Sequence, residues 1–140
     1  MEFTHAFYDA LPPEAAAIRQ AVFVEEQGFQ EEFDAIDRHA LHLLLFADGR
    51  SVGTLRAFTE DGGTRWHIGR VAVIQSARQL HLGRRMMDLA EAELRRRGAA
   101  GIEVSAQCRV QPFYEKCGFT SVGEVYLDEF CPHIRMVKEL

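Results

Sequence analysis

The sequence predicts a mixed α/β domain in which helices cover both faces of one sheet. Strand-like segments alternate with segments whose apolar residues recur at helical spacing, in the order β-α-β-β-β-α-β-α-β-β. The chain has 140 residues, 47% hydrophobic and 26% charged, which is enough for a domain with its own core. No linker, repeat or low-complexity stretch divides it, so we expect a single domain over residues 1–140.

One helix is expected in the first half of the chain. Pro12-Pro13-Glu14 favours a first helical turn, since proline and an acid both suit the start of a helix. Gly28 ends or kinks this helix, and a loop or short helix follows over residues 30–37. The strand segments are residues 2–8, residues 42–58 with a tight turn at Asp48-Gly49, and residues 66–74.

A long helix over residues 77–97 opens the second half. Arginines in its last turn complement the helix dipole, and Gly98 follows as a cap. The apolar face of this helix consists of Leu82, Met86, Leu89, Ala90 and Leu94. The remaining elements are strands over residues 102–106, 122–127 and 134–137 and a short helix over residues 112–117.

Composition argues against several classes of protein. The net charge of −5 disfavours general nucleic-acid binding, which needs a basic face. The longest apolar run, residues 43–47, is too short to cross a bilayer, and the first residues do not resemble a signal peptide. Cys108, Cys117 and Cys131 form no CxxC pair, which fits reduced thiols. We expect a cytoplasmic protein whose partners include neither membrane nor nucleic acid.

A helix start directly after a strand predicts an anion site. Residues 78–84, Arg-Gln-Leu-His-Leu-Gly-Arg, follow the strand that ends near Val73. At such a junction, unpaired backbone N–H groups and the helix dipole point toward one place. Many loops of this kind bind no phosphate, so the loop alone does not establish a phosphate site. The motifs on either side of it decide the interpretation.

Two spaced motifs surround this loop. Val73 is followed by Arg78, His81 and Gly83, and Gln107 precedes the stretch Phe113-Tyr114-Glu115-Lys116-Cys117-Gly118-Phe119. The first motif resembles V-x-x-x-x-(Q/R)-x-x-G-x-(G/A) of the GNAT N-acetyltransferases, and the second resembles their F/L-Y-x-K-x-G-F helix. His81 replaces the first motif glycine. We expect its N–H still to donate to phosphate if its φ stays negative.

The two ends of the chain resemble a small GNAT subgroup. Residues 18–27 are similar to its I/L-R-x-x-V-F-V-x-E-Q opening, and residues 123–136 to its G-E-x-Y…P-H-I-x-M close. The resemblance implies the GNAT acyl-CoA N-acyltransferase fold, with a mixed, mostly antiparallel sheet. It also implies transfer of the acetyl group of acetyl-CoA to a primary amine of a small molecule.

The resemblance further implies which residues hold acetyl-CoA, with no metal involved. They lie on the fourth strand, in the loop after it and at the tyrosine helix. The expected cofactor-binding residues are Val71, Ala72, Val73, Arg78, Gln79, Leu80, His81, Leu82, Gly83, Arg84, Gln107 and Tyr114.

Aminolysis of a thioester needs a base for the ammonium proton and an acid for the leaving thiolate. Tyr114 occupies the family's general-acid position, although a packing role beside Phe113 and Phe119 is the alternative. His133 is the expected base, because relatives with the same close use that histidine and a neutral imidazole accepts a proton near pH 7. A carboxylate acting through water is the competing interpretation, with three candidates: Glu26, Glu103 and Glu124.

Three further residues are expected to bind the acceptor substrate. Arg70 lies on the fourth strand, and Arg19 and Glu26 lie on the first helix, which borders the acceptor pocket in this family. Since arginine binds carboxylates in a bidentate manner, one interpretation is an amine that also carries an acidic group. Structural pairing of the arginines is the alternative.

Other functions compete with this one. A non-catalytic acyl-CoA-binding regulatory module would keep the fold, and a protein or peptide N-acetyltransferase would keep the chemistry. A metal site at His39-x-x-His42 has no third ligand at metal spacing. A cysteine hydrolase would pair Cys108 or Cys131 with His133. A homodimer is consistent with the sequence but not required by it.

Overall fold

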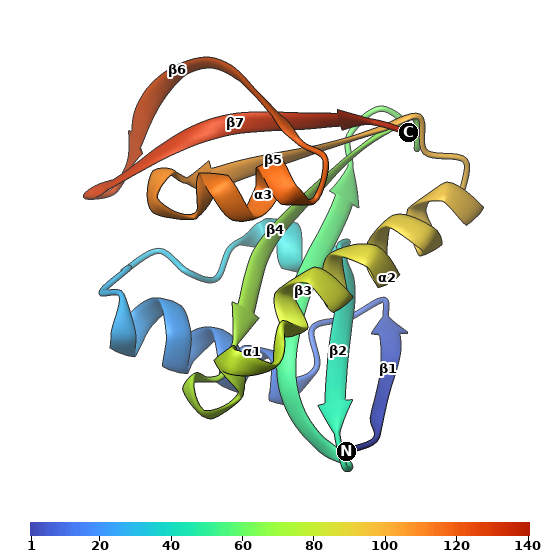
Figure 1. Cartoon of the computed structure of the whole chain (residues 1–140), viewed down its shortest axis with the longest axis vertical. Helices are drawn as coiled ribbons and strands as arrows, with labels where there is room; N and C mark the ends of the chain where they lie inside the picture. Colours follow the sequence, from blue (N-terminus) through green and yellow to red (C-terminus); the bar gives the residue numbers. More distant parts are fainter.

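The computed structural model describes residues 1–140 and contains one seven-stranded sheet with helices on both sides (Figure 1). The strand order is β1-β2-β3-β4-β5-β7-β6, and only β4 and β5 run parallel. This agrees with the expected mixed, mostly antiparallel sheet. The strands are β1 Phe3–Tyr8, β2 Leu41–Ala47, β3 Arg50–Thr59, β4 Arg65–Val73, β5 Gly101–Gln107, β6 Thr120–Asp128 and β7 Cys131–Glu139.

Three α-helices and several short helical turns connect these strands. α1 (Pro13–Arg19) continues as the π-helix η1 (Gln20–Glu26), and Gly28 follows with a φ of +84°. The other elements are the 3₁₀ helices η2 Ala35–Arg38, η3 Gln75–Leu80 and η4 Cys108–Val110, and the helices α2 Leu82–Arg96 and α3 Gln111–Lys116. None of the helices combines the length and the apolar character that crossing a membrane would require.

Apolar side chains leave both faces of β2, which explains its unbroken run of leucines. Leu43 and Leu45 join the larger core with Met86 and Leu94 of α2. Leu44 points to the other face and packs in a smaller core. That core also contains Ala15, Ile18, Val22, Phe23, Phe29 and Ala72. Both faces of the sheet are therefore covered, as the alternation of strand-like and helical segments in the sequence predicted.

The long helix begins later than the sequence predicted. We expected it from residue 77, but residues 75–80 form η3 and α2 begins at Leu82. His81 separates the two with φ +56° and ψ +36°, a left-handed conformation that no α-helix can continue through. The same value overturns the expectation of a negative φ at His81.

The parallel strands β4 and β5 pair over only part of their length. Their ladder runs from the pair Arg65 and Gly101 to the pair Ile68 and Val104 and then stops. Beyond it, β4 continues along β3 with a bulge at Arg70, whose φ is +53°. Figure 1 shows β4 and β5 diverging, with α3 and the β6–β7 hairpin above the gap. The candidate site lies along this divergence.

Candidate active site

Two adjoining cavities line the divergence of β4 and β5. The larger cavity has a volume of about 990 Å³ and extends along residues 71–73 to the start of α2 and to α3. The smaller cavity has a volume of about 130 Å³ and extends from residues 69–71 toward β5, β7 and the loop after η1. Both cavities are lined by Gln27, Val71, Arg109 and Val110, so they meet at β4.

The start of α2 forms one end of the larger cavity. No side chain caps this helix, and its first turn contains no acidic residue. Its first N–H groups therefore have neither an intrahelical acceptor nor a capping side chain. His81, Leu82, Gly83 and Arg84 all line the larger cavity at this point. The arrangement favours an anion.

His81 has a positive φ, so the condition under which its N–H was expected to donate to phosphate is not met. Its φ of +56° is a value that glycine adopts without cost, so the backbone follows a path that glycine would allow. A left-handed conformation costs free energy at a histidine. His81 nevertheless adopts it, so the backbone keeps the path that the motif glycine would take. The neighbouring Gly83 has a different constraint, because a Cβ there would lie 3.2 Å from the Phe113 ring.

Cationic side chains surround the larger cavity. Arg78, Arg84, Arg109 and Lys116 line it, against the single carboxylate of Glu26. Arg78 binds Glu26 through two contacts of 2.7 Å, and its Nε donates to the Val73 carbonyl at 3.0 Å. Hydrogen bonding by Arg78 lowers the pKa of Glu26. The larger cavity thus suits a long ligand with several negative charges.

Two of the expected cofactor residues are directed elsewhere. Gln79 and Leu80 lie in η3 with exposed side chains, and neither lines the larger or the smaller cavity. Val71, Ala72 and Val73 line the larger cavity. Gln107 lines only the smaller cavity, where its amide donates to the Gln27 side chain at 2.8 Å.

His133 is buried in the smaller cavity with one ring nitrogen free. Its side chain is 5% exposed, and Nδ1 lies 2.9 Å from the Cys131 carbonyl. Since a carbonyl only accepts, Nδ1 carries the hydrogen and Nε2 is left as an acceptor. Phe29 and Tyr126 flank the ring, with centroid separations of 6.4 and 6.0 Å. The imidazole is therefore held in one orientation, with no hydrogen-bond partner at Nε2 within the chain.

Tyr114 reaches the smaller cavity from α3. It is 8% exposed and lies between Phe113 and Phe119, but its hydroxyl has no hydrogen-bond partner in the chain. Burial raises the pKa of the Tyr114 phenol above its usual range. The hydroxyl therefore stays protonated at neutral pH and is available as a donor.

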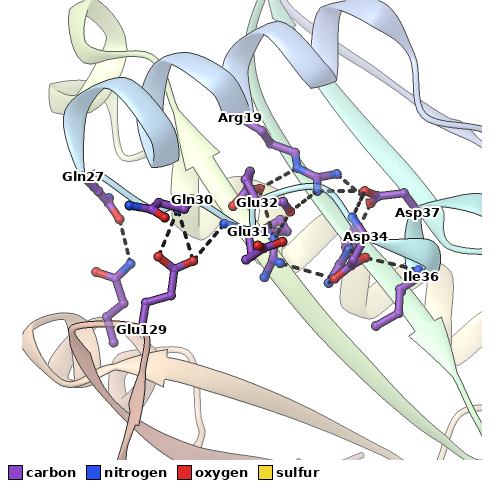
Figure 2. Close-up of polar contacts among 12 residues, drawn as sticks. Arg19, Gln27, Gln30, Glu31, Glu32, Asp34, Ile36, Asp37 and Glu129 are labelled. Carbon is purple, nitrogen blue, oxygen red and sulfur yellow. Dashed lines mark hydrogen bonds and ion pairs between the residues drawn. The ribbon is translucent and has the colours of Figure 1, made fainter.

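Arg19 does not bind substrate in this structure, which corrects the sequence-based expectation. It is 1% exposed and lines neither cavity. Its guanidinium donates to Glu32 at 2.9 Å and to Asp37 at 2.8 and 3.1 Å, as Figure 2 shows. Asp37 also accepts from Arg56 at 3.0 Å. Four of its five N–H donors are bonded within the chain, and the side chain is buried away from both cavities.

The two buried carboxylates of this network have pKa values shifted in opposite directions. Burial alone would raise the pKa of Asp37, but hydrogen bonds and charges of Arg19 and Arg56 outweigh it and lower that pKa to about 2. For Glu32 burial dominates, and its pKa is raised despite Arg70 and Arg19. The Arg56 Nε is buried without any partner. The network fixes the loop after η1 against the sheet.

Arg19→Ala should destabilise the fold by about 3–5 kcal/mol, since removing one partner of a buried ion network leaves charges unpaired. Chemical denaturation of the variant and the parent would measure this difference. Arg38→Ala, at an exposed position in the neighbouring η2, should change stability by no more than about 0.5 kcal/mol. A loss of similar size in both variants would contradict the structural role of Arg19.

Arg70 and Glu26 are also committed to partners. Arg70 lines the smaller cavity, but its Nε lies 3.0 Å from Glu32 and its Nη2 3.4 Å from Asp34. Glu26 lines only the larger cavity. The hypothesis that the substrate carries an acidic group therefore loses its support, because neither Arg19 nor Arg70 has an unpaired charge.

The competing carboxylate bases lie outside the smaller cavity. Glu103 binds Arg135 at 2.9 Å and lies 3.6 Å from His67. Glu124 is exposed on β6 and lines neither cavity. Four other acids line the smaller cavity, and we did not predict them as site residues: Glu31, Glu32, Asp128 and Glu129. Only the acidic character of residues 30–37 hinted at the first two.

The remaining alternatives find little support in the geometry. Burial raises the pKa of the Cys131 thiol, and its Sγ is directed to the Pro132 carbonyl at 3.8 Å rather than to His133. His42 is buried with Nε2 3.0 Å from the Asp37 carbonyl, and His39 packs on Phe58. No three His, Cys, Asp or Glu side chains are grouped as a metal site would require.

Known proteins share both the sequence pattern and this architecture. A family model described as an acetyltransferase (GNAT) domain matches residues 9–140. The chain belongs to this family. The relative YjcF of Bacillus subtilis, described as an uncharacterised N-acetyltransferase, is 31% identical over 129 residues, covering 90% of this chain and 91% of its own.

Solved structures agree with the assignment. An acyl-CoA N-acyltransferase from Pseudomonas aeruginosa is 30% identical, with a TM-score of 0.83 over 98% of each chain. An aminoglycoside 6′-N-acetyltransferase crystallised with coenzyme A has a TM-score of 0.77 over 97% of this chain and 96% of its own. Its identity of 18% shows a shared fold only. Relatives and fold together indicate an N-acetyltransferase that uses acetyl-CoA.

Proposed function

We propose that this GNAT enzyme acetylates a primary amine of a small molecule, with His133 as the base and Tyr114 as the acid. One observation carries the proposal. His133, with Nε2 free, and Tyr114, with an unpartnered hydroxyl, both line the smaller cavity, which shares four lining residues with the larger one. A protein that only bound acyl-CoA would need neither group.

The charge of the larger cavity suits acetyl-CoA. The uncapped start of α2 and the unpaired side chain of Lys116 would hold the phosphates, and Arg78 and Arg84 would add positive charge although each also pairs with a carboxylate of the chain. The absence of a side chain at Gly83 leaves room for the Phe113 ring beside that helix start. Bound there, acetyl-CoA would supply an activated acetyl group at the boundary between the two cavities.

The residues of the smaller cavity would then divide the chemistry. His133 Nε2 takes the ammonium proton, which frees the nitrogen lone pair to bond to the acetyl carbon. Tyr114 donates its phenolic proton to the sulfur as the carbon–sulfur bond breaks, and the second proton that the nitrogen loses restores the phenol. Backbone groups of β4 beyond Ile68 have no β5 partner, and an N–H near Val73 would stabilise the negative charge on the acetyl oxygen.

Acetyl-CoA should raise the melting temperature of the protein, because a ligand that binds only the native state stabilises it. A hundredfold excess over Kd is worth about 2.7 kcal/mol, which corresponds to roughly 8 °C for a chain of this length. Gly83→Asp should abolish this shift, since the new side chain meets Phe113 and places a carboxylate near the phosphates. Differential scanning fluorimetry would measure it.

The control is Gly83→Asn, which has the same bulk without the charge. It should retain a larger part of the shift than Gly83→Asp does. An undiminished shift in Gly83→Asp would place acetyl-CoA elsewhere. Release of free thiol with acetyl-CoA and a panel of small amines tests the reaction itself, and a panel without any accepted amine would count against the proposed function.

A further inference from the structure

Acidic side chains dominate the exposed rim of the smaller cavity. Glu31 and Asp128 line it from two different segments, the loop after η1 and the end of β6. Neither carboxylate forms an ion pair or accepts a hydrogen bond within the chain, and both residues are exposed. Their charges are therefore uncompensated and face whatever enters the cavity.

Glu129 adds a third negative charge and joins the two segments. Its carboxylate accepts the backbone N–H of Gln30 at 3.0 Å and that of Glu31 at 2.9 Å, as Figure 2 shows. These backbone hydrogen bonds lower the pKa of Glu129. These hydrogen bonds join the two segments that carry the acidic rim, which consists of Glu31, Asp128 and Glu129. The carboxylate of Glu129 stays ionised while it accepts them.

Positive charge in the smaller cavity is outnumbered, because four carboxylates and two arginines, Arg70 and Arg109, line it. Arg70 is paired with Glu32 and Asp34. Arg109 lines the larger cavity as well, beside the other cations that would hold acetyl-CoA. An acceptor therefore meets a negative rim, while the phosphates meet the positive charge of the adjoining larger cavity.

The interior of the smaller cavity provides a second, independent sign of a ligand. Tyr114 is more than nine-tenths buried and has an unpartnered hydroxyl there. With His133 Nε2 also free, this end suits the reacting amine, which must lose its charge. The volume of about 130 Å³ favours a narrow acceptor, whose other end would lie at the rim.

We propose that the acceptor carries a second cationic group, so that a small aliphatic diamine is preferred to a monoamine and to an amino acid. This inference rests on the proposed function, because it places the reacting nitrogen at His133 and Tyr114. Glu31 and Asp128 would attract the distal ammonium and orient the chain, with Glu129 adding charge.

Three acceptors of matched length test the proposal: 1,5-diaminopentane, pentylamine and 5-aminopentanoate. The probe is kcat/KM of the full chain with saturating acetyl-CoA at low ionic strength. The diamine should exceed pentylamine by about tenfold, corresponding to one or two exposed charge pairs, and 5-aminopentanoate should be the poorest. Raising the salt should reduce the preference, since these charges are exposed to solvent.

The double variant Glu31→Gln/Asp128→Asn should lower the ratio of diamine to pentylamine toward one while pentylamine turnover is kept. Asp9→Asn, an exposed acid remote from both cavities, should leave the ratio unchanged. Equal use of the three amines, or preference for 5-aminopentanoate, would overturn the inference and leave the acetyltransferase standing. If none of the three acceptors is acetylated, the inference is also overturned. The melting shift with acetyl-CoA would then show whether the protein still binds its cofactor.

Discussion

Tyr114→Phe is expected to lower kcat by about 10²–10⁴-fold while acetyl-CoA affinity stays nearly intact, as loss of an acid catalyst predicts. The substitution removes one oxygen from a side chain that otherwise packs between Phe113 and Phe119. That hydroxyl has no partner in the chain, so the fold loses no hydrogen bond. Since burial raises the pKa of Tyr114, the parent enzyme should keep its acid protonated throughout the neutral range.

Single-turnover kinetics would measure this loss at the chemical step, and a binding titration would measure acetyl-CoA affinity. Tyr8→Phe is the matched control, because Tyr8 lies on the edge strand β1 and lines neither cavity. Its kcat should stay within about twofold of the parent, as for surface substitutions away from a site. Full activity in Tyr114→Phe would reduce Tyr114 to a packing residue.

Local patterns in the sequence were sufficient for most of the fold. Alternating and helical periodicities located every strand. The turn at Asp48-Gly49 was also predicted correctly, because this pair of residues suits the positive φ values of a tight hairpin turn, which both residues have. The unbroken run Leu43–Leu45 indicated a strand covered on both faces, and the two cores confirm it. These features depend on neighbours along the chain, which a sequence displays directly.

Features that depend on distant partners could not be derived in the same way. Arg19 looked like a substrate ligand on the first helix, but Asp37, 18 residues later, and Glu32 enclose it. The left-handed conformation of His81 follows from the junction of η3 and α2, whereas its residue type favoured a negative φ. The acidic rim joins residues nearly 100 positions apart, and no motif marks it.

His133→Ala is expected to lower kcat/KM by about 10²–10⁴-fold near neutral pH, the usual contribution of a general base. The acidic limb of the kcat/KM profile should disappear with it, since the parent is active only while the imidazole is neutral and able to accept the ammonium proton. Acetyl-CoA binding should be unchanged, because the helix start that we propose for the phosphates belongs to α2 and His133 to β7.

The alkaline side of the profile separates His133 from other bases. At high pH more of the substrate is already free amine and needs no base, so His133→Ala should recover part of its activity there. His5→Ala, at an exposed histidine on β1, should retain the parent profile. If the acidic limb instead survives in His133→Ala, a carboxylate acting through water takes over the role. Of the three carboxylates expected from the sequence, Glu26, Glu103 and Glu124, only Glu26 lines either cavity, so Glu26 would then be the first residue to substitute.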